Sequence, residues 1–453
     1  MLVVGGGPAG MAAAARAANA GMAVTIVDEG ESLGGQYYRT RRLATGRGSP
    51  REFTRRFPSV RVLSETVLFD APTSHSAAVW SQEHGAEVLS YDAVCVATGA
   101  YDRSVPVPGW TLPGVLTAGG AHTLAHGFRT GPGRRMVVAG AGPFLLPVAC
   151  GLAAIGCSVE LVDAASTREY LRGVRPALRN APLLAEASWY GLQLAKHRVH
   201  LYRSGRVITR IHGEGRVESV TIQDVDSDWR GVCGTEVDVA ADGVCLSFGF
   251  VPQLELPHLL GCSIRYQGES GDFAVVVDAN MRTTIEAVFA AGETTGIAGV
   301  RVSRVEGQIA GLTAAFDAGV ITRTRLQSEV EPLQRVARHL RVFSEWMRLA
   351  FRPRPGLWEL AEPNTIVCRC EDVDLAQVDG ALAANDVSLS AVKSDTRAGM
   401  GLCQGRVCGP YIVERLRETH AYRVPDGHLP WSVRPPIRRV PLSAWMQAYS
   451  EDR

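Results

Sequence analysis

The sequence lacks the features of several common classes of protein. Its 453 residues carry 47 basic and 46 acidic side chains, so the formal net charge is only +1. Charges this evenly balanced create no long-range field toward nucleic acid or an acidic surface, and nucleic acid is not expected as a partner. No basic segment precedes the apolar residues at the N-terminus, so the pattern of a signal peptide is also missing.

Only one stretch is long and uncharged enough to suggest a membrane span. It runs from Met136 to Val159 as MVVAGAGPFLLPVACGLAAIGCSV. An uncharged run of this length could cross a bilayer. Its glycines and prolines, however, are grouped directly after a short β-type run, and this order favours a strand, a glycine turn and a helix. We therefore expect no membrane span and a cytoplasmic protein.

Motifs that would identify a catalytic base or a redox dithiol are scarce. No Cys-x-x-Cys pair lies between residues 1 and 319, which excludes the dithiol chemistry of disulfide reductases there. The 11 histidines include one pair at i, i+4 spacing, His122 and His126, and we interpret this pair as structural. The sequence therefore assigns no general base, and the catalytic residues stay unknown.

Ten cysteines are too few for a disulfide scaffold in a chain of 453 residues. Six of them are scattered singly among apolar neighbours, and we interpret them as small buried hydrophobic residues. These six are Cys95, Cys150, Cys157, Cys233, Cys245 and Cys262. The other four lie within 41 positions of one another, which indicates a set of metal ligands in a reducing compartment.

The first 29 residues have the order of a dinucleotide-binding unit. LVVGGGPAGMAAAARAANAGMAVTIVDE gives a strand, the turn Gly5-x-Gly7-x-x-Gly10, an alanine-rich helix, a second strand and an acid. Gly5 permits the tight turn, Gly7 lets backbone amides approach a pyrophosphate, and Gly10 allows the helix to pack closely on the strand. Pro8 and Ala9 lie where the helix begins, so free amides and the positive end of the dipole face the phosphate.

Two further groups belong to this predicted site. Asp28 ends the second strand, 21 residues after Gly7, where a carboxylate can accept hydrogen bonds from both ribose hydroxyls. Glu29 beside it is the second candidate. GESLGGQYYR follows the acid and adds Gly35 and Gln36 to the predicted cofactor-binding residues.

Two later motifs make FAD the expected ligand. YDAVCVATGAYDR contains Thr98 and Gly99 after an apolar strand, and TTIEAVFAAGETTGIAG contains Gly292 and Glu293 before a helix. This set resembles the flavoprotein reductases with two dinucleotide-binding domains. The resemblance implies that the late Gly–acid pair contacts the ribityl and phosphate region, and that the next helix points its N-terminus at the isoalloxazine. That family usually has Asp where this chain has Glu293.

A second glycine turn lies about 135 residues further on, in RRMVVAGAGPFLLPVACGLAAIGCSVELVDAA. Gly140 and Gly142 repeat the pattern, but Leu145 replaces the third glycine, and we expect it to hold the helix away from the strand. Asp163 ends the second strand and could meet a ribose. Three uses stay open: an NAD(P) site, a site for another adenine nucleotide, or a domain retained for its architecture.

The four clustered cysteines form two pairs. Cys368 and Cys370 are one residue apart, and Cys403 and Cys408 follow in AGMGLCQGRVCG. Four thiolates from two loops suit zinc as well as a [2Fe–2S] cluster. The spacing resembles the bacterioferritin-associated-ferredoxin-like [2Fe–2S] domain, and a flavin upstream would give a one-electron centre a donor. We therefore expect a [2Fe–2S] cluster, with zinc as the alternative.

These motifs predict an α/β fold: a two-dinucleotide-binding-domain flavoprotein, in which a Rossmann-like FAD domain carries an inserted NAD-like domain, plus a small C-terminal helical [2Fe–2S] domain. We assign 1–126 and 251–319 to the FAD-binding domain and 127–250 to the insertion. Residues 320–362 form a connector with an amphipathic helix, 363–418 the [2Fe–2S] domain, and 419–453 a proline-rich tail that we expect to be extended.

Several stretches together resemble one family over nearly the whole chain: GGGPAG, GGQYYR, ATGAYDRSVPVPGWTLPGVLTAGGA, AGAGPFLLPVA, FGFVPQLEL, AAGETTGI and the cysteine segment. They look like the alpha subunits of heteromeric FAD-dependent dehydrogenases of amines and imino acids. That family includes opine oxidases, proline and hydroxyproline dehydrogenases and the flavoprotein subunit of hydrogen cyanide synthase.

The resemblance implies that an oxidase-like beta subunit holds the site for a small amine or imino-acid substrate. This chain would receive the electrons and pass them through its iron–sulfur centre to an acceptor that the sequence does not identify. Two other functions stay open. One is a self-sufficient NAD(P)H-dependent reductase that delivers electrons through the cluster. The other is an iron-binding or sensing protein with a vestigial flavin domain.

Overall fold

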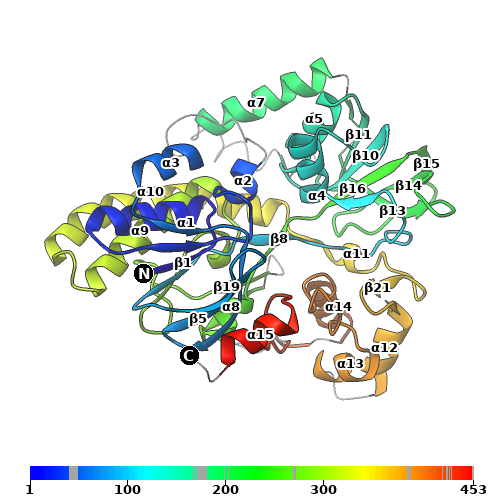
Figure 1. The fold of residues 1–453 in the computed structure, drawn as a ribbon. Helices are drawn as coiled ribbons and strands as arrows, with labels where there is room; N and C mark the ends of the chain where they lie inside the picture. The colour runs from blue at the N-terminus through cyan, green and yellow to red at the C-terminus, as the bar shows by residue number, and fades with distance from the viewer. Residues whose placement is uncertain are drawn as a thin grey trace.

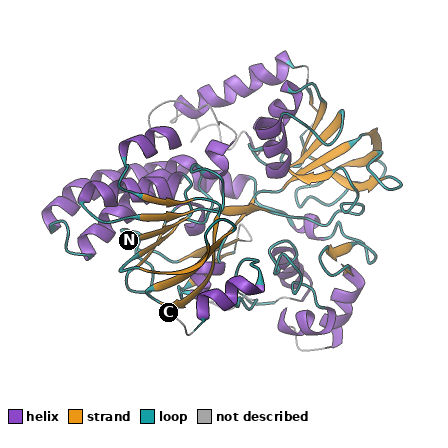
Figure 2. Ribbon diagram, in the orientation of Figure 1, coloured by secondary structure: helices purple, strands orange, loops and turns teal. Residues whose placement is uncertain are grey.

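The computed structural model describes residues 1–39, 49–166, 169–170, 181–197, 199–201, 204–268, 272–384, 389–420, 422–424, 427, 429 and 431–450. Its elements form two α/β units and a smaller, mainly helical part (Figure 1). Both larger units combine strands with covering helices, as Figure 2 shows. The mixed α/β class expected from the sequence is therefore confirmed.

The first unit is built on a parallel sheet with the strand order β20-β7-β1-β2-β3. β1 lies at its centre, because Leu2 pairs with Thr25 on one side and with Val94 on the other. The central strands are short, apolar and buried, as expected for a parallel sheet. The strands are β1 (Leu2–Val4), β2 (Thr25–Val27), β3 (Arg61–Leu63), β7 (Val94–Val96) and β20 (Val288–Ala290).

Two helices from opposite ends of this unit lie against each other, and glycine makes the contact possible. A Cβ at Gly307 would lie 2.1 Å from the carbonyl oxygen of Ala9, and one at Gly311 would lie 2.2 Å from that of Ala13. Only glycine lets the two backbones approach this closely. The late part of the chain is thereby fixed beside the first glycine turn. The helices of this region are α1 (Pro8–Ala20), α2 (Gly35–Arg39), α3 (Pro50–Arg56), α8 (Glu255–Leu259), η2 (Gly292–Thr295), α9 (Val300–Asp317) and α10 (Arg323–Ala350).

An antiparallel sheet on the first unit is covered by the end of the chain. It consists of β4 (Thr66–Thr73), β5 (Ser76–Ser81) and β6 (Gly85–Ser90). The helix α15 (Leu442–Tyr449) lies on this sheet, with the ring centroid of Trp445 5.7 Å from that of Phe69. Tyr449 donates its hydroxyl to Asp70 at 2.5 Å. The expectation of an extended tail is therefore wrong for this segment, because its apolar residues gain a surface to pack on after the last proline.

The second unit contains the parallel sheet β12-β11-β10-β16-β9 and a three-stranded sheet, β13-β14-β15. Its strands are β9 (Val115–Thr117), β10 (Arg135–Gly140), β11 (Ser158–Asp163), β12 (His200–Leu201), β13 (Arg206–His212), β14 (Ser219–Asp224), β15 (Val237–Ala240) and β16 (Gly243–Ser247). Its helices are α4 (Ala118–Thr123), the π-helix η1 (Leu124–Phe128), α5 (Leu145–Ala154) and α7 (Ala181–Lys196).

A two-stranded neck joins the two units. β8 (Ala100–Asp102) leaves the first unit and β17 (Phe250–Pro252) returns to it, and the two strands pair antiparallel through Tyr101 and Val251. A further hairpin of the first unit, β18 (Ile264–Gln267) and β19 (Asp272–Val275), follows β17 along the chain. The neck is important below because the cysteine-bearing part of the chain packs beside it.

The C-terminal part begins after the long helix α10. It contains α11 (Pro355–Trp358), β21 (Ile366–Cys368), β22 (Val373–Asp374), α12 (Leu375–Ala384), α13 (Leu389–Thr396) and α14 (Gly409–His420). Asp374 begins α12 with a reciprocal cap: Gln377 N–H donates to its Oδ1 at 2.9 Å, and its own N–H donates to Gln377 Oε1 at 3.0 Å. We refer to residues 363–418 as the cysteine module.

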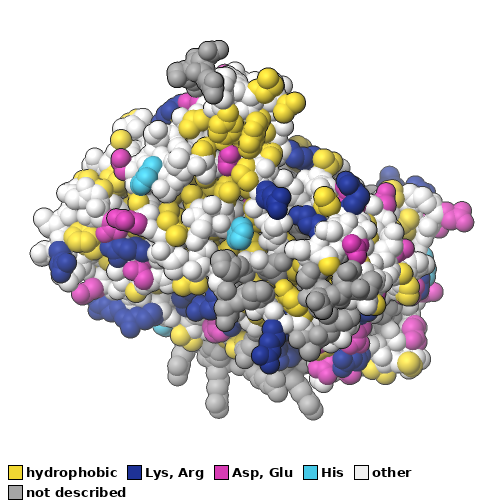
Figure 3. Space-filling view, turned by 90° about the horizontal axis from the view of Figure 1, so that it is seen from below, with side chains coloured by type: hydrophobic (Ala, Val, Ile, Leu, Met, Phe, Trp, Pro, Cys, Tyr) yellow, Lys and Arg dark blue, Asp and Glu magenta, His cyan; other side chains and the backbone are white. Residues whose placement is uncertain are grey.

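The uncharged run 136–159 forms β10, a turn, α5 and the start of β11, as its glycines and prolines predicted. Among the described residues, no helix is both long and apolar enough to cross a membrane. Basic and acidic side chains are interspersed over the face drawn in Figure 3, in keeping with a net charge of +1.

Candidate functional site

The first glycine turn is shaped by close backbone contacts. Gly5 has φ +100°, and a Cβ on it would lie 2.3 Å from the carbonyl oxygen of Ala97. A Cβ on Gly10 would lie 1.9 Å from the carbonyl oxygen of Gly5. Both positions therefore require glycine in the folded protein. Gly7 differs, since the nearest atom to its Cβ position is Gly35 Cα at 3.9 Å, which leaves room above the turn.

Helix α1 starts directly beside this open space at Gly7. Gly7 is the N-cap residue, and the first helical bond runs from the N–H of Met11 to the carbonyl of Gly7 at 2.9 Å. Ala9 lies in the first turn, before Met11, so its N–H has no carbonyl partner within the helix. Pro8 occupies the first helical position, where its missing N–H costs nothing. The turn thus has the form of an anion-binding helix start.

The two candidate acids after β2 have different surroundings. Asp28 accepts hydrogen bonds from the N–H of Gly6 at 2.5 Å and of Gly30 at 2.7 Å, so its carboxylate lies against the glycine turn. Glu29 forms an ion pair with Arg438 of the tail at 2.5 Å. The geometry favours Asp28 as the ribose ligand.

The other predicted flavin-contacting residues gather around the same edge of the sheet. Gly34 donates to the carbonyl of Gly6 at 2.7 Å, which holds Gly35 beside Gly7 at the start of α2, whereas Gln36 is exposed. Their membership of the site remains a prediction.

Thr98 and Gly99 lie where the first unit meets the neck. The hydroxyl of Thr98 donates to the carbonyl of Gln253 at 3.2 Å, and the N–H of Gln253 donates to the carbonyl of Gly99 at 2.9 Å. Gly99 has φ +82°, and the space around its Cβ position is open. The end of β7 is therefore tied to the returning strand of the neck.

The late Gly–acid pair lies beside the first turn. A Cβ on Gly292 would lie 2.9 Å from Ala9 Cβ. The carboxyl of Glu293 accepts from the N–H of Gly299 at 2.8 Å and of Ala298 at 3.3 Å, at the beginning of α9. Burial raises the pKa of Glu293 to about 7, against the lowering effect of these amides. Glu293 thus holds the two residues that lead into α9, the helix that was expected to face the flavin.

Sequence reasoning missed a second buried acid at this place. Glu306 accepts from the N–H of Gly292 and from the hydroxyl of Thr295, each at 3.0 Å, and it forms an ion pair with Arg341 of α10. A carboxylate that is 1% exposed needs such partners. The available signal was a lone acid in the otherwise small and apolar stretch VEGQIAGLTAA.

The second glycine turn is built differently from the first. Gly140 again requires glycine, because a Cβ would lie 1.8 Å from the carbonyl oxygen of Ser247. Helix α5, however, begins only at Leu145, whereas α1 begins directly after its second glycine. The amides of Leu145 and Leu146 donate to the carbonyls of Gly142 and Pro143, each at 3.2 Å. These amides are therefore already used within the turn.

Aromatic side chains lie at the edge where this turn would bind a nucleotide. Tyr170 donates its hydroxyl to Asp163, the predicted ribose ligand, and burial raises the pKa of Asp163 to about 6. The ring of Tyr170 lies 5.3 Å from that of Phe351, centroid to centroid. Phe351 in turn lies 3.6 Å from the Cβ position of Gly142. This arrangement favours an architectural role for the second unit.

His122 of α4 and His126 of η1 belong to an aromatic cluster. The ring centroids of His122 and His126 are 4.3 Å apart, and His122 also contacts Phe144 at 5.6 Å. The single cysteines are mostly buried as expected, but Cys233 is exposed and Cys157 is partly exposed, so their interpretation as buried residues was wrong.

The four clustered cysteines come together in the structure. Cys408 is hydrogen-bonded to Cys368 and to Cys403, and Cys403 is also hydrogen-bonded to Cys370. Cys408 lies directly before α14, so the positive end of that helix faces the sulfurs. The neighbouring Cys408 sulfur lowers the pKa of both Cys368 and Cys403 below the ordinary value of a thiol.

Backbone amides also surround these sulfurs. Cys368 receives hydrogen bonds from the amides of Gly399, Cys370 and Glu371. Cys403 receives them from the amides of Gly405 and Val407. Amide donors that stabilise thiolates are typical of iron–sulfur sites.

Glycine shapes the loop that carries the second cysteine pair. Gly399 and Gly405 have φ values of +82° and +83°, and a Cβ on Gly401 would lie 2.3 Å from Cys370 Cβ. Across the described ranges, no group of three or more His, Cys, Asp or Glu side chains is arranged to hold a single metal ion.

Comparisons with known proteins agree with this geometry. The family model described as "Pyridine nucleotide-disulphide oxidoreductase" matches residues 1–319. The model described as "BFD-like [2Fe-2S] binding domain" matches residues 366–418. The expected cofactors, FAD and a [2Fe–2S] cluster, are thereby confirmed, and NAD(P) remains open.

Several curated relatives match nearly the whole chain. One of them, a subunit of the opine oxidase of Rhizobium meliloti, is 30% identical, covering 99% of this chain and 87% of its own length. Another, the HcnB subunit of hydrogen cyanide synthase of Pseudomonas protegens, is 29% identical, covering 98% and 97%. Among solved structures, L-proline dehydrogenase from P. horikoshii superimposes with a TM-score of 0.66 at 18% identity, covering 98% of this chain and 78% of that one. At this low identity, the superposition shows a shared fold alone.

Proposed function

Because this chain belongs to the pyridine nucleotide-disulphide oxidoreductase family and carries a BFD-like [2Fe–2S] domain, we propose that it is the electron-transfer subunit of a heteromeric dehydrogenase. Its substrates would be amino acids, imino acids or opines, as the names of its relatives suggest. The observation that carries the proposal is the direct packing of the cysteine module beside the neck, where Arg406 donates to Tyr101 at 2.9 Å. One chain thus joins the predicted flavin-binding unit to the cysteine module through this neck.

The residues of this chain would bind and orient the flavin and the cluster. The amide of Ala9, above Gly7, would hold the pyrophosphate at the start of α1. Asp28 would orient the ribose, and the Gly292–Glu293 pair would hold the ribityl end. FAD accepts two electrons and the cluster carries one at a time, so the pair can divide a two-electron oxidation into single transfers.

The substrate site is proposed to lie on a partner. Both relatives are named as subunits, which supports the presence of a partner. We propose that this partner is an oxidase-like beta subunit that removes electrons from the amine or imino acid. The clustering of four cysteines as predicted cluster ligands suits a reducing compartment, and we propose a cytoplasmic location.

The alternative, a self-sufficient NAD(P)H-dependent reductase, predicts rapid reduction of the flavin by NADH. We expect no rapid bleaching of the flavin band when NADH or NADPH is added anaerobically. The reason is that Tyr170 and Phe351 lie at the second glycine turn and the amides of Leu145 and Leu146 are already bonded. Stopped-flow absorbance at the flavin maximum is the measurement. Bleaching within seconds would revive the alternative.

Purification tests the main proposal directly. The isolated chain is expected to contain about one FAD and about two irons with two acid-labile sulfides, the content of one [2Fe–2S] cluster. Substrate should reduce it only when the partner subunit is added. Zinc in place of iron would contradict the proposal. Iron and sulfide without flavin would instead favour the sensing or iron-binding alternative.

A further inference from the structure

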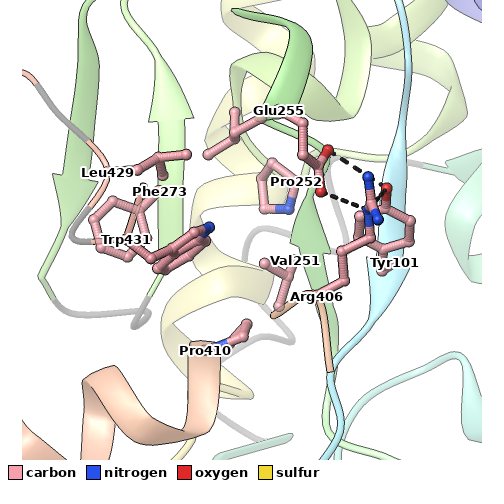
Figure 4. A pocket seen from close by; sticks show the side chains of 10 residues that line it. Tyr101, Val251, Pro252, Glu255, Phe273, Arg406, Pro410, Leu429 and Trp431 are labelled. Atoms are coloured by element: carbon pink, nitrogen blue, oxygen red, sulfur yellow. Dashed lines mark hydrogen bonds and ion pairs between the residues drawn. The ribbon is translucent and has the colours of Figure 1, made fainter. Parts of the chain in front are cut away.

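A small, partly open cavity lies between the first unit and the cysteine module (Figure 4). Its volume of about 20 Å³ is enough for roughly one water molecule. Apolar side chains line most of it, and Glu255, Tyr101 and Arg406 close one end. The wall contributed by the cysteine module and the following chain consists of Arg406, Pro410, Leu429 and Trp431. The two parts therefore meet across a mainly apolar contact.

Arg406 is the charged residue that links the two parts here. It lies between Cys403 and Cys408 in the chain and donates to the carbonyl of Cys403 at 3.1 Å. Its guanidinium also donates to the hydroxyl of Tyr101 at 2.9 Å and forms an ion pair with Glu255 at 2.8 Å. The side chains of Arg406 and Glu255 are only 14% and 13% exposed.

Further contacts hold the side chains of Arg406 and Glu255 in place. The guanidinium donates further to the carbonyl of Ile437 and to Gln404 Oε1. Arg438 adds a second positive charge 3.9 Å from Glu255. A second polar contact lies nearby, where Tyr266 donates to Glu414 of α14 at 2.8 Å. The cysteine module is thus held to the first unit at two places.

Charges at such a contact act strongly on a neighbouring redox centre. A cluster gains one negative charge when it is reduced, and its potential depends on nearby charge, hydrogen bonds and exposure to solvent. Solvent screening is reduced because both side chains are largely buried beside a mainly apolar cavity. The guanidinium should therefore favour the reduced cluster, and the carboxylate of Glu255 should oppose it.

We propose that the Arg406–Glu255 pair sets the reduction potential of the [2Fe–2S] cluster and fixes the loop of Cys403 against the neck of the flavin unit. Arg406 acts as a positioning residue, since it reaches the cluster loop through the carbonyl of Cys403 and the first unit through Tyr101 and Glu255. The proposal rests on the proposed function, because it requires that the four cysteines hold a [2Fe–2S] cluster.

The test compares the direction in which two substitutions shift the midpoint potential of the cluster in the holoprotein. Arg406→Gln is expected to lower the cluster's midpoint potential and Glu255→Gln to raise it. At a fixed solution potential, each substitution should change the ratio of reduced to oxidised cluster on the order of 10-fold, and the two changes should be in opposite directions. This is the size expected when a unit charge is removed near a partly buried site. The double variant should return close to wild type. Redox titration followed by low-temperature electron paramagnetic resonance of the reduced cluster provides the measurement.

Two controls separate charge from structure. Arg406→Lys keeps the charge and loses most of the hydrogen bonds, so its potential should stay near that of the wild type. Arg397→Gln removes another arginine of the module, which pairs with Glu371 beside Cys370 but is 64% exposed, and its shift should be small.

The inference would be overturned if Arg406→Gln and Glu255→Gln shifted the midpoint potential in the same direction, or if neither variant shifted it. If Arg406→Gln fails to assemble a cluster, the sign of the Glu255→Gln shift decides alone. Absence of any reducible cluster in the wild type would instead overturn the proposed function.

Discussion

Replacing Cys403 with Ser is expected to stop electron delivery to an external acceptor while FAD stays bound. Cys403 is hydrogen-bonded to both Cys370 and Cys408, so its loss breaks the set of four sulfurs at its middle. The predicted flavin-contacting residues belong to the first unit and share no side chain with this set. Acceptor reduction by the complex with its partner should fall to the level of the protein-free control, with the flavin spectrum retained.

A matched cysteine shows whether the effect is specific. Cys233 is exposed and lies outside the cysteine module, so Cys233→Ser should leave iron content and turnover unchanged. Iron analysis and visible absorbance follow the cluster, and acceptor reduction follows the electron flow. Unchanged turnover in Cys403→Ser, with its iron lost, would mean that the cluster is not on the route of the electrons.

Local patterns in the sequence were sufficient for the parts of the site that depend on neighbouring residues. The glycine turn at Gly5, Gly7 and Gly10 is set by contacts within a single strand–turn–helix unit, so its spacing carried the information. The four cysteines could be grouped because few other residue types bind iron–sulfur clusters.

Contacts between distant segments could not be read in the same way. Phe351 lies beside Gly142, and Arg406 beside Glu255, although long stretches of chain separate the members of each pair. No periodicity or motif encodes such a contact, since it depends on how whole units pack. The buried Glu306 was missed for the same reason, because its partner Arg341 belongs to a different helix.

The tail shows how tertiary packing overrides a compositional rule. Its prolines predicted an extended chain, yet Leu442–Tyr449 is helical. The segment after Pro441 contains no further proline, and Ala444 is buried against the β4–β6 sheet with Phe69 and Ala78. Helices of this length gain most of their stability from such packing.

The opposite behaviour of two glycines in the first turn gives the sharpest test of the flavin site. Gly7→Ala is expected to leave the apoprotein folded, because Gly7 has φ −71° and its Cβ position lies 3.9 Å from the nearest atom. The new methyl group would instead stand where the pyrophosphate approaches. Losing one charge-assisted hydrogen bond costs about 1.5–3 kcal/mol, so FAD affinity should fall roughly 10- to 100-fold.

Gly10→Ala should behave differently, since its Cβ would lie 1.9 Å from the carbonyl oxygen of Gly5. Helix α1 must then move off β1, and overpacking of this kind costs about 1–3 kcal/mol. The melting temperature of the apoprotein should therefore fall in Gly10→Ala and stay constant in Gly7→Ala. Thermal melts with and without FAD measure both effects, because a bound ligand raises the melting temperature by an amount that grows with its affinity. Full FAD stabilisation of Gly7→Ala would show that the pyrophosphate does not lie at this turn.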